Sequence, residues 1–173
     1  MRIYWAGMFS AGVVSLASAC ATNAPPTTKA AAVERVQCDP GSTDRDEEQL
    51  VRSTTVLKVS PLYSHVNSNT NGEERVNGAK LLVRPPKGVS AEQMTRTLQC
   101  HSARILLGQA PSDSIPNDPY WLPETWVNID VTPENGNFAI TVSADSVRDN
   151  LQVFSRANHF ADSHMLATDP GLP

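Results

Sequence analysis

The sequence predicts an α+β fold, a two-layer sandwich in which an antiparallel sheet of about four strands packs against two helices in the order ββαββα. Three patterns predict it: two early runs of β-branched and aliphatic residues, an alternating hairpin pattern, and two amphipathic helical segments. A sheet and two helices with one apolar face each bury those faces against one another. The 173 residues suffice for one such domain.

The first two strands are predicted at Thr54–Val59 and Ala79–Arg84, the second ending at Pro85-Pro86. The segment between them is rich in Asn and Ser, which is typical of a loop. A short helical turn is expected over Asp44–Leu50, ahead of the first strand.

The first helix is predicted to start at Ser90, because Ser90 and Gln93 have the spacing of a capping box. Gly108 is expected to end the helix. Spacings of four, three and four place four residues on one face: Met94, Leu98, His101 and Ile105. A single histidine in such a stripe is interpreted as a partly buried core residue whose polar atoms are satisfied.

The hairpin is predicted from Trp126–Val131 and Asn137–Val142, which alternate on either side of Glu134-Asn135-Gly136. The second helix is expected to begin near Ser143 or Asp145. Its apolar face is predicted from three residues at helical spacing: Val147, Leu151 and Phe154. Ala157 and Ala161 are expected to continue this face as an edge of small residues.

Residues 1–19 are predicted to be a signal peptide, since Arg2 precedes an uncharged run that ends in small residues. Leu16–Cys20 resembles a bacterial lipobox, and the resemblance implies that the Cys20 thiol receives a diacylglyceryl group before cleavage. Leu16 lies four residues before the cysteine, where the family prefers three. Ala17-Ser18-Ala19 equally fits ordinary signal peptidase, so the alternative is a soluble periplasmic or secreted product that begins at Cys20.

Residues 20–33 are predicted to form the lipidated end and a flexible linker, because Ala21–Ala32 is a low-complexity segment. Residues 34–166 are predicted to be a single α+β domain, and residues 167–173 a disordered tail. Ala21 resembles the second residue of lipoproteins sent to an outer membrane. That resemblance implies an anchor in the inner leaflet of the outer membrane, facing the periplasm.

Two further resemblances concern the folded part. Leu81–Ala157 is similar in element order to the β-α-β-β-α modules of BON and secretin N-domains, and this implies a fold only. Gly88–Glu92, Leu98–Ala103 and Asn137–Val142 resemble uncharacterised proteobacterial lipoproteins that carry a Cys-His pair on a helix. That family implies no particular function.

The cysteines predict a disulfide. If Cys20 is acylated, Cys38 and Cys100 remain, and two remaining cysteines in an oxidising periplasm most simply pair. A loop of about 60 residues closed in this way is worth roughly 4 kcal/mol in the chain-entropy model. The alternative is a metal-handling or stress-response protein that uses both cysteines with His101 and a distant histidine. Cys100 and His101, adjacent on a helix, point about 100° apart, which is poor geometry for joint ligation.

The composition argues against nucleic-acid binding, because 14 Lys and Arg face 18 Asp and Glu for a net charge of -4. No nucleophile elbow, zinc motif or phosphate-binding glycine loop occurs, so no catalytic residue, cofactor or metal site is predicted. Glu47-Glu48 is expected to be solvated surface. Trp121 and Trp126 are candidates for a small exposed aromatic surface that contacts a partner, or else pack the hairpin over a helix.

The predicted function is a lipid-anchored, non-catalytic periplasmic module that binds another envelope component or supports an assembly.

Overall fold

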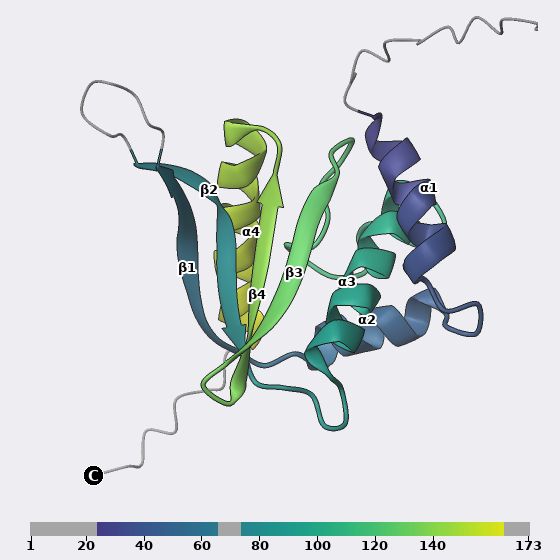
Figure 1. Cartoon of the computed structure of the whole chain (residues 1–173), viewed down its shortest axis with the longest axis horizontal. Coiled ribbons are helices and arrows are strands. Elements are labelled where there is room, and N and C mark those ends of the chain that lie inside the picture. The colour runs from purple at the N-terminus through teal and green to yellow at the C-terminus, as the bar shows by residue number, and fades with distance from the viewer. Residues whose placement is uncertain (1–23, 66–73, 165–173) are drawn as a thin grey trace, which may run out of the picture.

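The computed structural model describes residues 24–65 and 74–164, which form one four-stranded antiparallel sheet and four helices (Figure 1). The elements in chain order are α1 (Pro26–Gln37), α2 (Asp44–Ser53), β1 (Val56–His65), β2 (Glu74–Val83), α3 (Ala91–Leu106), β3 (Val127–Glu134), β4 (Asn137–Ala144) and α4 (Val147–His164). The α+β class and the four antiparallel strands are confirmed. The predicted number of helices is wrong, because α1 and α2 precede the six expected elements.

α1 occupies part of the segment that is predicted to be a flexible linker. Pro26 stands at the first helical position, where its missing N–H needs no partner, and an alanine run follows. Ala30 is fully buried in a small core with Ala103 and Trp126. The linker prediction is therefore wrong from Pro26 onward, because packing on α3 stabilises a helix whose composition alone resembles that of a tether.

α2 forms from a strongly polar segment because its start is capped. The Thr43 hydroxyl accepts a hydrogen bond from the Asp46 backbone N–H at 3.3 Å, and the Asp46 carboxylate accepts one from the Thr43 N–H at 2.9 Å. This carboxylate is hydrogen-bonded in its charged form, which lowers the pKa of Asp46. Val51 is the fully buried apolar residue of α2, and it joins the main core. The expected helical turn is thus confirmed and is longer than predicted.

The strand order in the sheet is β1-β2-β4-β3. Asn135 and Gly136 adopt positive φ values of 51° and 78°, which suit the tight turn of a two-residue hairpin between β3 and β4. The predicted hairpin is confirmed, with Glu134 facing Asn137 across the turn. In Figure 1 this turn lies at the lower end of the sheet.

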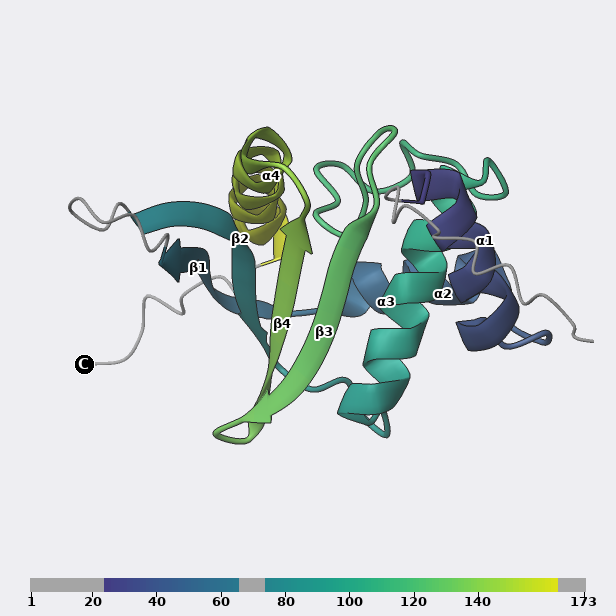
Figure 2. The same cartoon turned by 45° about the horizontal axis from the view of Figure 1, so that its top comes forward.

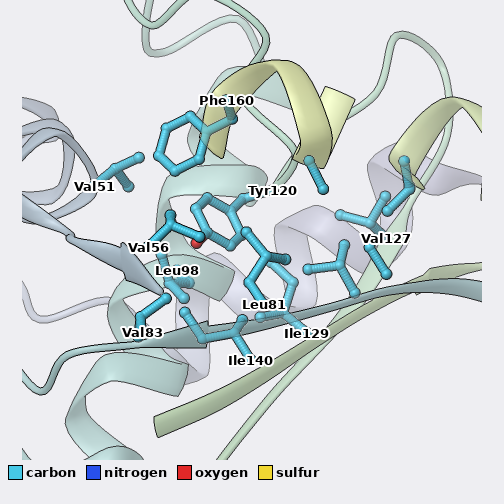
Figure 3. Close-up of a cluster of buried hydrophobic side chains, with 14 of the residues drawn as sticks. Val51, Val56, Leu81, Val83, Leu98, Tyr120, Val127, Ile129, Ile140 and Phe160 are labelled. Carbon is cyan, nitrogen blue, oxygen red and sulfur yellow. The ribbon is translucent and has the colours of Figure 1, made fainter. Parts of the chain in front are cut away.

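A continuous hydrophobic core lies between one face of the sheet and side chains from α2, α3 and α4 (Figure 3). Leu81 and Ile140 enter it from the two central strands, and Leu98 and Phe160 from α3 and α4. The aromatic rings of Tyr120 and Phe160 meet edge to face with their centroids 6.0 Å apart. Helices far apart in the sequence therefore share one core with the sheet.

The buried face of α4 matches the predicted one only in part: Phe154 packs against the core and Ala157 and Ala161 are buried, as predicted, but Val147 and Leu151 are not. Val147 and Leu151 are 49% and 51% exposed, and the buried residues are Asn150, Val153, Ala157, Phe160 and Ala161. The Asn150 side chain accepts a hydrogen bond from the Ala144 N–H at 2.7 Å and donates one to the Ala144 carbonyl at 3.0 Å. These two bonds turn a polar residue toward the sheet, so the predicted apolar pair faces outward.

The two edges of the sheet differ. The Gln99 side chain on α3 donates a hydrogen bond of 2.9 Å to the carbonyl of Ile129 in edge strand β3. Edge strand β1 pairs with β2 alone among the described strands, contains Pro61, and has two register shifts along that pairing. Helix α3 thus lies along the β3 edge, whereas β1 pairs on one side only among the described strands.

Candidate functional site

A disulfide joins the end of α1 to the middle of α3. Cys38 is the C-cap residue of α1, Cys100 lies within α3, and their Cα atoms are 5.3 Å apart. Cys100 is 2% exposed, whereas Cys38 is half-buried. The bond confirms the predicted pairing and closes a loop between positions separated by 62 residues.

The pairing removes the sulfur ligands that the metal-handling alternative requires, because a disulfide offers no thiolate. Within residues 24–65 and 74–164, no group of three or more His, Cys, Asp and Glu side chains could hold a metal ion. His101 instead lies with its Nε2 atom 2.6 Å from Asp118 Oδ2, and both side chains are buried. His101 is therefore a satisfied core residue, as its place in the apolar stripe predicts, and it is more fully buried than expected.

A hollow of about 470 Å³ opens beside the disulfide, between the end of α1, α2 and the first half of α3. Its lining combines apolar with polar residues, among them Val36, Leu50, Gln93, Arg96 and Thr97. No sequence motif marks this hollow, because its lining comes from three helices that lie apart in the chain.

Glu47 on α2 is a buried carboxylate at the edge of this hollow. Its Oε1 atom lies 2.8 Å from Arg104 Nη1 on α3 and accepts a hydrogen bond from the Ser42 hydroxyl at 3.2 Å. Its Oε2 atom is buried without a hydrogen-bond partner in the structure. Burial raises the pKa of Glu47, although the Arg104 charge acts in the opposite direction. The expectation of a solvated surface is thus wrong for Glu47, whose ion pair joins α2 to α3.

Asp118 fixes the irregular segment between α3 and β3. One carboxylate oxygen contacts His101, and the other accepts a hydrogen bond from the Tyr120 backbone N–H at 2.9 Å. Arg156 on α4 donates to the backbone carbonyls of Asp118 and Trp121 at 3.0 and 2.9 Å. The proline-rich segment is therefore held from both sides, by α3 and by α4.

Tyr120→Phe is expected to raise the free energy of unfolding by about 1 kcal/mol. The Tyr120 ring is fully buried, and its hydroxyl has no hydrogen-bond partner in the structure. Burial also raises the pKa of this hydroxyl, so the phenol stays neutral. Removing the oxygen removes a desolvated group that nothing compensates. Urea unfolding of the two proteins measures the difference, and a clear loss of stability would show that a bound water satisfies the hydroxyl.

The two tryptophans do not form the exposed aromatic surface considered for a partner. Trp126 is 8% exposed and packs with Ala30 and Ala103 in the small core between α1 and α3. Trp121 is half-buried, with the Arg156 guanidinium 5.0 Å from its ring centre. Trp126 therefore serves to dock α1, a role that its sequence neighbourhood does not indicate because its contacts come from distant helices.

Cys20 and the predicted signal peptide lie outside the described residues. Within the described part of the chain, no helix combines the length and apolar character needed to cross a bilayer. Comparisons with protein-family models, with curated proteins and with solved structures give no match.

Proposed function

We propose that the chain is a lipid-anchored module of the bacterial cell envelope that binds another envelope component or supports an assembly without catalysing a reaction. The observation that carries the proposal is the pairing of Cys38 with Cys100. Disulfides persist outside the reducing cytoplasm, so this bond supports export of the chain. The pairing leaves Cys20 as the single remaining cysteine, at the end of a signal-peptide pattern.

The buried polar groups support a structural rather than a chemical role. The Glu47 carboxylate engages Arg104, and the His101 ring engages Asp118. Each pair links two segments of the chain, and a group held in this way is poorly placed to exchange protons with a substrate. We infer that the sheet and its helices form a rigid two-layer scaffold that presents a surface to a partner.

Cys20→Ser is expected to abolish incorporation of a fatty-acid analogue and to release the protein from the membrane fraction. The reason is that serine has no thiol to receive the diacylglyceryl group. The measurement is metabolic labelling of cells followed by fractionation. The matched control is Cys38→Ser, which breaks the disulfide and should keep the label. An unlabelled wild-type protein in the soluble fraction would contradict the anchor and favour the soluble product cut at the same bond.

The partner can be sought by crosslinking intact membranes and purifying the wild-type protein. We expect a crosslinked species that contains a second envelope protein. Recovery of an uncrosslinked monomer alone, across reagents of several lengths, would contradict a role in binding or assembly.

A further inference from the structure

The start of α1 stays close to Cys20 in any conformation of the intervening chain. Pro26, the first residue of α1, follows Cys20 by six positions. A fully extended chain advances at most about 3.6 Å per residue, so the helix begins within roughly 22 Å of the anchor. A lipid on Cys20 would therefore keep the start of α1 within roughly 22 Å of the membrane surface.

The starts of α1 and α4 lie at the same end of the molecule. Lys29, in the first turn of α1, forms an ion pair with Asp145, just before α4, at a Nζ to Oδ2 distance of 3.2 Å. Figure 1 shows both helix starts at the upper end, and Figure 2 turns this end forward. The last residues of β1 lie at this upper end as well.

Most of the exposed large hydrophobic side chains of the described chain belong to segments that lie at this end. Four are exposed, and three of them belong here: Tyr63 at 55%, Val147 at 49% and Leu151 at 51%. Tyr63 is two residues before the end of β1 and pairs with Val76 on β2. Asn77, which follows Val76 on β2, accepts a hydrogen bond of 3.2 Å from the side chain of Asn150. Asn150 precedes Leu151 on α4.

The fourth exposed side chain, Val36, is 76% exposed and lies in the last turn of α1, away from this end. Val36 therefore serves as an internal control. Both sites are apolar and exposed, but Val36 lies at the far end of α1, away from the end at which the chain leaves toward Cys20.

We propose that Tyr63, Val147 and Leu151 form a membrane-facing surface that rests on the lipid bilayer to which Cys20 is attached. The inference rests on the proposed lipid anchor and adds an orientation to it. Aliphatic side chains and a tyrosine suit the boundary between headgroups and acyl chains, where the tyrosine hydroxyl stays hydrated. Three side chains are too few to bind a membrane alone. The anchor supplies the high effective concentration at which their contact forms.

The test is hydroxyl-radical footprinting of the acylated full-length protein on vesicles of phosphatidylethanolamine and phosphatidylglycerol. The unacylated Cys20→Ser protein in solution is the reference. Modification of Tyr63 and Leu151 is expected to fall several-fold on the vesicles, while modification of Val36 stays unchanged. Leu151→Gln should restore modification of Tyr63 in the acylated protein, and the matched variant Val36→Gln should not.

The outcomes separate the surface from the anchor. If the acylated protein sediments with vesicles but Tyr63 and Leu151 stay as reactive as Val36, the membrane-facing surface is wrong and the anchor stands. If the wild-type protein carries no lipid, the proposed anchor itself fails. Protection of Tyr63 and Leu151 that rises with the concentration of the unacylated protein would assign the surface to a second copy of the chain, and would overturn the proposal.

Discussion

Cys38→Ser is expected to lower the free energy of unfolding by about 4 kcal/mol, the entropy of closing a loop of this length in the chain-entropy model. The disulfide spans 62 residues and holds the end of α1 on α3. Without it, α1 depends on a small core around Ala30 and Trp126 and on the exposed Lys29–Asp145 ion pair. Urea unfolding followed by circular dichroism measures the loss.

The controls for this prediction use the same bond. Cys100→Ser should lower the free energy of unfolding at least as much as Cys38→Ser does, because it also places a hydroxyl at a position that is 2% exposed. The double variant should lose no more unfolding free energy than the Cys100→Ser protein, because the two substitutions break the same disulfide. Reductant should destabilise the wild type and leave the double variant unchanged. Losses that simply add would show that the disulfide contributes little.

Arg104→Ala is expected to lower the free energy of unfolding by about 3–5 kcal/mol near neutral pH, because it leaves the buried Glu47 carboxylate without its cation. The two side chains are 13% and 3% exposed, so water replaces the arginine poorly. The cost should depend on pH. Burial already raises the pKa of Glu47 above its ordinary value of 4.5, and loss of Arg104 should raise this pKa further.

The sign follows from proton binding. Where the folded state binds the Glu47 proton more tightly than the unfolded state does, stability falls as the pH rises from 4.5 through the raised pKa of the folded protein. The difference in unfolding free energy between the wild type and the Arg104→Ala protein should therefore be larger at pH 8 than at pH 5. Unfolding curves at both values measure it. Adding Glu47→Gln to Arg104→Ala should remove the pH dependence and recover part of the stability. A pH-independent loss in the single variant would contradict an unpaired buried carboxylate.

The sequence predicts best those elements whose formation is determined by residues within or directly beside them. The β3–β4 hairpin follows from alternation and from Asn135-Gly136, and the start of α3 follows from Ser90. The errors concern tertiary contacts. α1 reads as a tether because its packing partner Trp126 lies nearly a hundred residues further on. In the first turns of α4, Val147 and Leu151 are wrongly predicted to be buried. Asn150 faces the sheet there because it bonds the end of β4, and a hydrophobic period does not reveal such a bond.

The candidate site divides in the same way. The disulfide is predictable because two cysteines remain once Cys20 is set apart, and counting requires no geometry. The burial of Glu47 is not predictable, since it depends on Arg104, which lies 57 positions along the chain. His101 is predicted to be partly buried with its polar atoms satisfied, yet its partner Asp118 is known only from the structure.

The unequal edges of the sheet limit how this protein can associate by strand pairing. α3 lies along β3, where the Gln99 side chain bonds the Ile129 carbonyl. Within residues 24–65 and 74–164, β1 is therefore the edge strand that a strand from another molecule can join. When two molecules pair through β1, this edge is occupied in both, and the result is a closed dimer with twofold symmetry. An endless ribbon needs a free edge on each side of every molecule. Self-association by this route therefore ends at a dimer, and the register shifts and Pro61 of β1 weaken even that step.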